Sequence, residues 1–219
     1  MTAMIELIDV TKRYPGGHVT LANVDLQIQH GEMVFITGRS GAGKSTLLKL
    51  IGSLEKPTSG HIKIGNEDIS RLRRATLPYF RLNIGMIFQD HKLLYDRSVL
   101  DNVLLPLQIR EVHGAEATRR ARAALEKVGL GNRERSRPIT LSGGEQQRLC
   151  IARAIVGRPR LILADEPTAN LDDDYAHEIM GILQALNEGG DTILISTHDQ
   201  DLITRYGKRR LVLADGSLS

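Results

Sequence analysis

The sequence predicts an α/β fold in which a largely parallel sheet carries an inserted helical lobe. Short apolar runs typical of buried parallel strands alternate with stretches of helical periodicity. The runs are EMVFIT at 32–37, IGMIF at 84–88, LILA at 161–164 and TILIS at 192–196. From residue 91 to about residue 140 no such run recurs, and the pattern indicates helices packed against the sheet.

The other segments complete this order. Strand-like stretches at 4–10 and 19–28 flank the turn KRYPGG, and a further short strand is expected at 61–64. The basic stretch 71–81 is expected at the surface. Helices are expected at 44–54, 116–128, 142–156 and 174–187, and a closing strand at 211–213. In the second of these helices, Ala121, Leu125 and Val128 share one face.

Composition limits the classes of function. The 219 residues are 41% hydrophobic and 25% charged, with a net charge of only +3. Aromatic residues make up 4% and Trp is absent, so stacking on bases is not indicated and no nucleic acid is expected as a partner. The single cysteine, Cys150, excludes an intramolecular disulfide, and we expect it to be a packing residue. No apolar run reaches about 18 residues, so a partner would have to hold the chain at a membrane.

A glycine-rich loop follows the strand at 32–37 and opens a helix. Residues 38–45 read GRSGAGKS, which matches G-x-x-x-x-G-K-[ST] in the required strand–loop–helix context. Glycine backbone angles and the helix N-terminus favour a phosphate group, Lys44 adds a positive charge, and the Ser45 hydroxyl suits Mg²⁺. An incidental glycine-rich turn is the alternative. The loop therefore predicts ATP contacts from Gly38, Arg39, Ser40, Gly41, Ala42, Gly43, Lys44, Ser45 and Thr46.

Two carboxylates end the buried strand at 161–164. Ligands of open parallel sheets bind at the carboxyl ends of strands, where Asp165 and Glu166 lie. Asp165 is expected to hold Mg²⁺, and Glu166 to polarise the attacking water as a general base. Alone, the two residues would equally well begin a loop before Pro167. Beside a phosphate loop, the catalytic interpretation is favoured.

A third motif points to a family. Residues 141–148, LSGGEQQR, closely resemble the signature motif of ATP-binding-cassette ATPases. Ser142 is expected to cap a helix, with Gly143 and Gly144 exposing N–H groups toward a phosphate. The resemblance implies that this motif closes in trans over ATP held by a second subunit, giving an ATP-dependent homodimer.

The same resemblance implies a fold. It has a RecA-like parallel-sheet core, an N-terminal antiparallel β subdomain and an inserted α-helical subdomain. One ATP-binding domain would span the whole chain, with 1–90 and 158–219 as nucleotide-binding core and about 91–157 as helical subdomain.

Further positions match the family in chain order. The resemblance implies that Tyr14 stacks on adenine, that Gln89 contacts Mg²⁺ and the water, and that His198 contacts the γ-phosphate. Asp172 lies in the loop ANLD that communicates across the dimer. The expected catalytic set is Glu166, His198, Gln89 and Lys44, and the expected metal set is Ser45, Gln89 and Asp165. Singly, Tyr14 would be an ordinary turn aromatic and His198 a helix cap; their joint order favours the functional interpretation.

The subgroup follows from two further stretches. PTANLD at 167–172 is similar to the PTGNLD of lipoprotein-releasing, macrolide-exporting and cell-division cassettes, with Ala169 in place of Gly. The stretch 84–106 is most similar to the cell-division group. That resemblance implies a peripheral protein on the cytoplasmic face of the bacterial inner membrane. It would act with an FtsX-type integral membrane protein, and its ATP-driven dimerisation would regulate peptidoglycan hydrolysis.

Three other functions could use some of these motifs. A lipoprotein-releasing or macrolide-exporter ATPase would use the same chemistry with another partner. A DNA-repair cassette is disfavoured because the chain has no sustained heptads. A scaffold that binds ATP without hydrolysis is disfavoured by Glu166 and His198.

The segment after Gln89 gives a docking hypothesis. In the family, the membrane partner is received near this junction, which suggests that Leu93, Leu94 and Tyr95 line the docking groove. The alternative is that they are core residues of the helical lobe.

Overall fold

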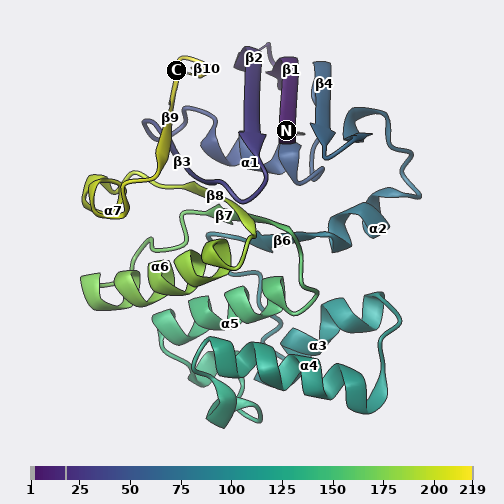
Figure 1. Cartoon of the computed structure of the whole chain (residues 1–219), viewed down its shortest axis with the longest axis vertical. Helices are drawn as coiled ribbons and strands as arrows, with labels where there is room; N and C mark the ends of the chain where they lie inside the picture. Colours follow the sequence, from purple (N-terminus) through teal and green to yellow (C-terminus); the bar gives the residue numbers. More distant parts are fainter. Residues whose placement is uncertain (1–2, 18, 219) are drawn as a thin grey trace.

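Two β-sheets and a helical layer make up the molecule, a computed structural model that describes residues 3–17 and 19–218 (Figure 1). The strands are β1 Ala3–Arg13, β2 Val19–Gln29, β3 Met33–Thr37, β4 Ser59–Ile64, β5 Glu67–Asp68, β6 Ile84–Ile87, β7 Leu161–Asp165, β8 Thr192–Ser196, β9 Arg209–Ala214 and β10 Ser217–Leu218. The helices are α1 Lys44–Ile51, α2 Leu77–Leu82, α3 Val99–Ile109, α4 Gly114–Lys127, α5 Gly143–Ile155, α6 Asp173–Glu188 and α7 Gln200–Tyr206. Short 3₁₀ turns cover Ile69–Arg71, Gly131–Arg133 and Pro138–Thr140.

The larger sheet has the strand order β10-β9-β3-β8-β7-β6. Its strands from β9 to β6 are parallel, and β10 pairs antiparallel with β9. Every residue of β3 and β8 is buried, which explains why these strands appear in the sequence as unbroken apolar runs. The predicted α/β class with a largely parallel sheet is confirmed.

Both faces of this sheet are covered. In β3, Met33 and Phe35 pack in the same cluster as the helical layer. Val34 and Ile36 point the other way, into a second cluster with α1 and the smaller sheet. The sheet therefore lies between the helical layer and α1, as Figure 1 shows.

The smaller sheet lies on the far side of α1 (Figure 1) and has the order β2-β1-β4-β5. Its neighbouring strands pair antiparallel, as the family resemblance implied. The apolar side chains Leu47, Leu48 and Leu50 of α1 are buried in the cluster that the helix shares with this sheet and with one face of the larger sheet. The two sheets therefore hold α1 between them, and with it the loop that precedes the helix.

The helical layer is built from α3, α4 and α5. Ala121, Leu125 and Val128 are buried in its core, as the periodicity predicts. Three helices were not predicted individually: α2, α3 and α7. The basic stretch 71–81 contains α2, whose Leu77 and Phe80 are buried, while the arginines at 71, 73 and 74 before the helix are exposed. Within the described ranges, no helix is long and apolar enough to cross a membrane.

A buried asparagine joins the segment after Gln89 to α3. Asn102 is fully buried, and its Nδ2 donates to the carbonyl oxygens of Leu94, at 3.0 Å, and Ser98, at 2.9 Å. Its Oδ1 accepts from the Leu94 N–H at 2.9 Å. The backbone of Leu94 is thereby paired through one side chain, which fixes the 93–95 segment against the helix.

Replacing Asn102 by Ala should lower the free energy of unfolding by about 2–4 kcal/mol, because it leaves the Leu94 backbone groups without their partners. Chemical denaturation of the purified protein measures this. Asn132→Ala, at an exposed position of the same lobe, is the control and should change stability by less than about 0.5 kcal/mol. Equal stabilities of the two variants would contradict the assignment.

The structure divides the three residues of the docking hypothesis. Leu93 is buried in the helical core, so the docking interpretation is wrong for this residue. Leu94 is half-buried, while Tyr95 is 46% exposed and its hydroxyl donates to Gln146 Oε1 at 3.3 Å. Only Leu94 and Tyr95 therefore remain available for a partner.

Candidate active site

The phosphate loop connects β3 to α1 and depends on glycine at both ends. Gly38 has φ +150°, and a Cβ atom there would lie 2.3 Å from the Leu213 carbonyl oxygen. Gly43, at φ +106°, is the N-cap residue of α1, and no side chain caps this helix. Left-handed backbone at Gly43 suits glycine. The uncapped N-terminus presents donors that suit a phosphate group.

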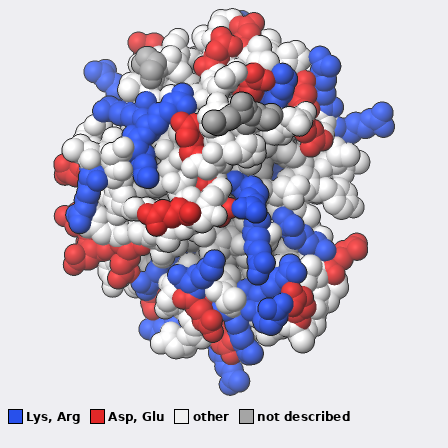
Figure 2. Space-filling view, viewed as in Figure 1, with Lys and Arg blue, Asp and Glu red and all other residues white. Residues whose placement is uncertain are grey.

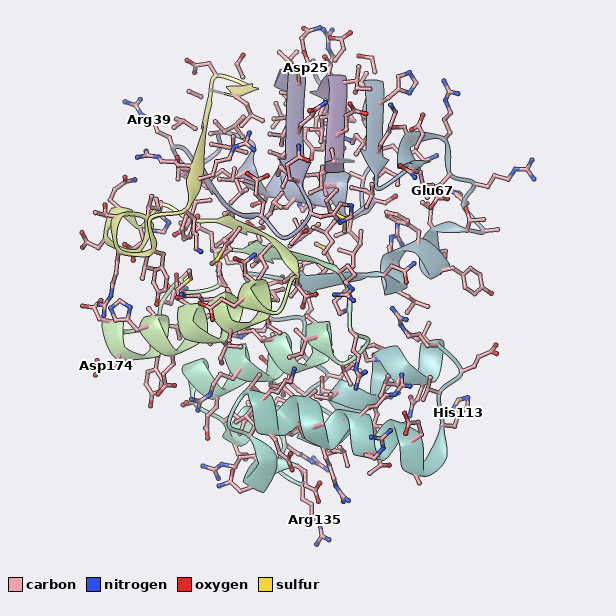
Figure 3. The ribbon with its side chains drawn as sticks, in the orientation of Figure 1. Asp25, Arg39, Glu67, His113, Arg135 and Asp174 are labelled. Carbon is pink, nitrogen blue, oxygen red and sulfur yellow. The ribbon has the colours of Figure 1, made fainter. Side chains whose placement is uncertain are left out.

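Lys44 begins α1 and curls back over the loop. Its ammonium donates to the carbonyl oxygens of Gly38, at 2.9 Å, and Arg39, at 3.3 Å. The side chain is only 9% exposed, and Nζ lies 3.7 Å from Glu166 Oε1. Arg39 itself extends outward at the edge of the molecule, as Figure 3 shows.

An open cavity of about 620 Å³ lies over this loop. It is lined by Tyr14, Thr20, Gly38, Arg39, Ser40, Gly41, Gly43, Lys44, Ser45, Thr46, Gln89, Glu166 and His198. Most of the predicted site residues are thus brought together from five separate segments. Those outside this lining are Ala42, Ser142, Gly143, Gly144, Asp165 and Asp172.

Asp165 lies behind the lining and organises two hydroxyl groups. Ser45 Oγ donates to Asp165 Oδ1 at 3.0 Å, and Ser196 Oγ donates to the same oxygen at 2.6 Å. This pairing brings the ends of α1, β7 and β8 to one point. A hydroxyl and a carboxylate side by side match the oxygen ligands that Mg²⁺ prefers, so the donor set fits this ion.

Glu166 follows in a strained backbone conformation. Its φ is +47°, which is uncommon for a residue other than glycine. Its N–H donates to Ser196 Oγ at 2.9 Å and to the Ser196 carbonyl at 3.1 Å. These two bonds hold the carboxylate over the cavity, where Oε2 lies 2.9 Å from His198 Nδ1.

Glu166 therefore stands between a lysine and a histidine. Its side chain is 11% exposed, whereas His198 is 74% exposed at the rim. A shielded carboxylate aligned by a neighbouring imidazole is arranged to accept a proton from a water molecule in the cavity. Gln89, exposed just after β6, lies on the same lining.

Tyr14 lies in the loop between β1 and β2, with its hydroxyl tied down. It donates to Glu55 Oε2 at 2.8 Å and lies 3.3 Å from Thr46 Oγ1. Lys12 Nζ is 3.0 Å from the same Glu55 oxygen and 4.9 Å from the centre of the Tyr14 ring. The ring is therefore positioned on the cavity by three neighbours, rather than left as an unconstrained turn residue.

The signature motif lies elsewhere. Ser142 caps α5 in a capping box with Glu145, as the predicted helix start requires. Ser142 and Gly143 are exposed, and a Cβ atom at Gly144 would meet the Tyr175 ring at 2.9 Å. Asp172 is the N-cap of α6 and accepts from the Tyr175 N–H. None of these groups reaches the phosphate-loop cavity of its own chain.

Sequence reasoning missed several supporting residues. Ser196 orders both Asp165 and Glu166, Thr20 packs against Gly43, and Glu55 holds Tyr14. Ser196 carried a usable signal, because a polar side chain at the carboxyl end of a buried parallel strand faces the ligand side. Thr20 and Glu55 carried no such signal in the sequence. Thr20 lies in a predicted edge strand and Glu55 at the end of a predicted helix, and neither pattern indicates a contact with the site.

Comparison with known proteins agrees with this geometry. A sequence model described as ABC transporter matches residues 21–169, more than half of the chain. The chain belongs to the ABC transporter family. It is an ATPase of the ABC type.

Its relatives cover nearly the whole chain. It is 51% identical over 215 residues to the cell division ATP-binding protein FtsE of Escherichia coli K12, covering 98% of this chain and 97% of that one. It is 43% identical to the lipoprotein-releasing system ATP-binding protein LolD of Geobacter metallireducens, covering 99% and 98%.

A solved structure matches the fold. The dimeric ATP-binding cassette MJ0796 in a post-hydrolysis state bound to ADP and Pi superimposes with a TM-score of 0.90 at 41% identity, covering 99% of this chain and 97% of that one. This ABC ATPase thus has the fold that its sequence predicts.

Cys150 lies on the signature helix and is a packing residue, as expected. It is 1% exposed and its thiol donates to the His91 carbonyl at 3.2 Å. Burial raises the pKa of this thiol to about 12. At pH 8 only about one thiol in 10⁴ is then ionised, and the thiolate is the reactive form.

The native protein should therefore not react with Ellman's reagent at pH 8 in the time that the guanidinium-unfolded chain releases one equivalent of thionitrobenzoate. Absorbance at 412 nm measures the reaction. Rapid labelling of the folded protein, under conditions where its circular dichroism is unchanged, would contradict this assignment.

Proposed function

We propose that this chain is the ATP-hydrolysing subunit of a cell-division complex and acts with an FtsX-type integral membrane protein. The observation that carries the ATPase chemistry is the placement of Glu166 between Lys44 and His198 at the phosphate loop. The 51% identity to FtsE over 98% of the chain supports the cell-division role.

Nucleotide binding falls to the cavity residues. The loop N–H groups and Lys44 take the phosphates, Tyr14 supports the adenine, and Arg39, Ser40, Gly41, Ala42 and Thr46 complete the loop. Ser45, Gln89 and Asp165 would hold Mg²⁺, which neutralises charge on the phosphate oxygens when bound.

Hydrolysis follows from the carboxylate. Glu166 accepts the proton of the attacking water as the water oxygen bonds to the γ-phosphorus and the bond to ADP breaks. His198 aligns Glu166 through its 2.9 Å contact and would contact the γ-phosphate from the rim of the cavity. Gln89 lines the same cavity and would help to position the water.

Closure requires a second copy. Ser142 and Gly143 are exposed at the start of α5, Gly144 is buried beside them, and all three lie outside the cavity of their own chain. They would close over the ATP of a partner, with Asp172 in the loop that crosses the dimer. Residues 91–157 would form the helical subdomain, and 1–90 with 158–219 the core.

The complex would lie at the cytoplasmic face of the bacterial inner membrane, where ATP-driven dimerisation regulates peptidoglycan hydrolysis through the partner. Affinity capture of the Glu166→Gln variant from solubilised membranes with ATP and Mg²⁺ tests this. We expect an FtsX-type protein in the eluate and filamentous cells on depletion. Capture of a lipoprotein-releasing or exporter membrane subunit, with normal division on depletion, would instead support a transport ATPase, the function suggested by the 43% identity to LolD.

A further inference from the structure

A second cavity, separate from the phosphate loop, lies among the helices of the molecule. Its volume is about 390 Å³, and α4, the loop from α5 to β7 and the end of α6 enclose it. The floor is apolar, with Ala124, Ile155, Pro159 and Leu186 among its residues. It shares no lining residue with the phosphate-loop cavity. Nothing in the ATPase chemistry uses it.

Positive charge surrounds this apolar floor. The lining contains Arg119, Arg120, Lys127, Arg158 and Arg160, against a single acid, Asp191. Figure 2 shows lysine and arginine side chains gathered on the lower half of the face seen there, over α4 and its neighbours. The cavity therefore carries a positive excess at its rim.

Neighbouring acids neutralise only part of this charge. Glu116 pairs with both Arg119, at 2.5 Å, and Arg120, at 2.6 Å. The Arg160–Asp191 pair is long, at 3.9 Å. Within residues 3–17 and 19–218, the side chains of Lys127 and Arg158 form no hydrogen bond and no ion pair, although the charge of Lys127, like that of Arg160, acts on Asp191.

Those two cations come from two separate segments that line the cavity. Lys127 ends α4, and Arg158 projects from the loop before β7 with its backbone at φ +53°. Left-handed backbone is uncommon outside glycine, and it is found where surrounding structure fixes a residue in place.

The partly buried Arg110 lies next to this lining. The guanidinium of Arg110 lies beside Gly157, where a Cβ atom would be 3.2 Å from Arg110 Nε. This Nε is buried and has no hydrogen-bond partner among the described residues. Burial, and then the charge of Arg120, lowers the pKa of Arg110. Arg110 does not itself line the cavity, but its charge repels that of Arg120, which does, and an anion in the cavity would reduce this repulsion.

We propose that this cavity binds a small organic anion that joins a phosphate, sulfonate or carboxylate group to an apolar body. The apolar body would cover the floor, and the anionic group would lie between Lys127 and Arg158 in charge-assisted contact. The volume lies in the range of small-molecule sites. An inorganic anion alone would leave the apolar floor in contact with water. A neutral apolar molecule would leave the cations without an anionic partner.

The probe is 8-anilinonaphthalene-1-sulfonate, which combines a sulfonate with an aromatic body and fluoresces in apolar surroundings. It is titrated into the full-length protein with saturating ATP and Mg²⁺, so that the phosphate loop is filled. We expect a saturable signal with a stoichiometry of one per chain, undiminished by millimolar inorganic phosphate.

Charge reversal identifies the location. Lys127→Glu/Arg158→Glu changes two exposed residues and should weaken probe binding by about tenfold or more. Arg135→Glu/Arg137→Glu makes the same change of net charge at exposed positions outside the cavity and should leave affinity unchanged. Arg135 projects away from the body of the lobe in Figure 3.

A third variant tests whether the probe occupies the cavity. Ala123→Phe, on the exposed side of α4 within the lining, should fill the cavity and abolish the signal. Thermal unfolding confirms that each variant is folded. Absence of a saturable signal in the presence of saturating ATP, or equal affinities of the two charge-reversal variants, would overturn the proposal.

Discussion

Replacing Glu166 by Gln should lower the rate of ATP hydrolysis by a factor of about 10² to 10⁴ and leave ATP binding in place. Glutamine keeps the shape of the side chain and its backbone bonds to Ser196, but it cannot accept the proton of the attacking water. Because the bound ATP is no longer hydrolysed, the variant should accumulate as the ATP-bound dimer. Phosphate release and light scattering after gel filtration measure the two effects.

The matched control is Glu188→Gln, which makes the same chemical change at an exposed position where, among the described residues, the carboxylate accepts only from Gln184. It should retain the parent turnover and the parent monomer–dimer balance. If Glu166→Gln hydrolysed ATP at the parent rate, the general-base role would have to be given to another residue of the cavity.

Gly38→Ala should cost about 3 kcal/mol or more of stability and weaken ATP binding severely. The new methyl group would lie 2.3 Å from the Leu213 carbonyl and 3.3 Å from the Ala42 Cβ, at a backbone angle of φ +150°. Either β9 or the phosphate loop must move. In a chain of this length, that cost lowers the melting temperature by about 6–12 °C.

Gly41→Ala separates the clash from backbone strain. Gly41 belongs to the same loop and has φ +79°, but a Cβ atom there would have no neighbour within 4 Å. It should lose only about 1 kcal/mol. Thermal unfolding and titration with a fluorescent ATP analogue compare the two variants. Equal losses would show that strain alone, and not the contact with Leu213, decides the position.

Much of the fold and the site is local in origin. Unbroken apolar runs identify buried parallel strands because both faces of the sheet are covered, as the alternating clusters around Val34 and Phe35 show. The phosphate loop is equally local: glycine angles, a helix start and Lys44 follow each other within eight residues.

Three predictions depended on more than local pattern and were incomplete. The helix α2 was overlooked because four arginines within 71–81 obscure the two side chains, Leu77 and Phe80, that it buries. The helix α3 contains Pro106, which weakens its helical signal. Leu93 was assigned to a docking groove, although its burial depends on packing against helices that no local pattern reveals.

The sequence by itself determined the chemistry: a phosphate loop, two carboxylates at a strand end, a signature motif and their order along the chain. Tertiary structure alone decided which groups meet. Ser45 and Asp165, 120 residues apart, share a hydrogen bond because the register of β7 beside β8 and the packing of α1 bring them together. Ser142 stays away from the same point, because the helical layer holds α5 on the opposite side of the sheet from α1. Local residue patterns specify what each segment can do, whereas contacts between distant segments depend on packing that is fixed only when the whole core forms.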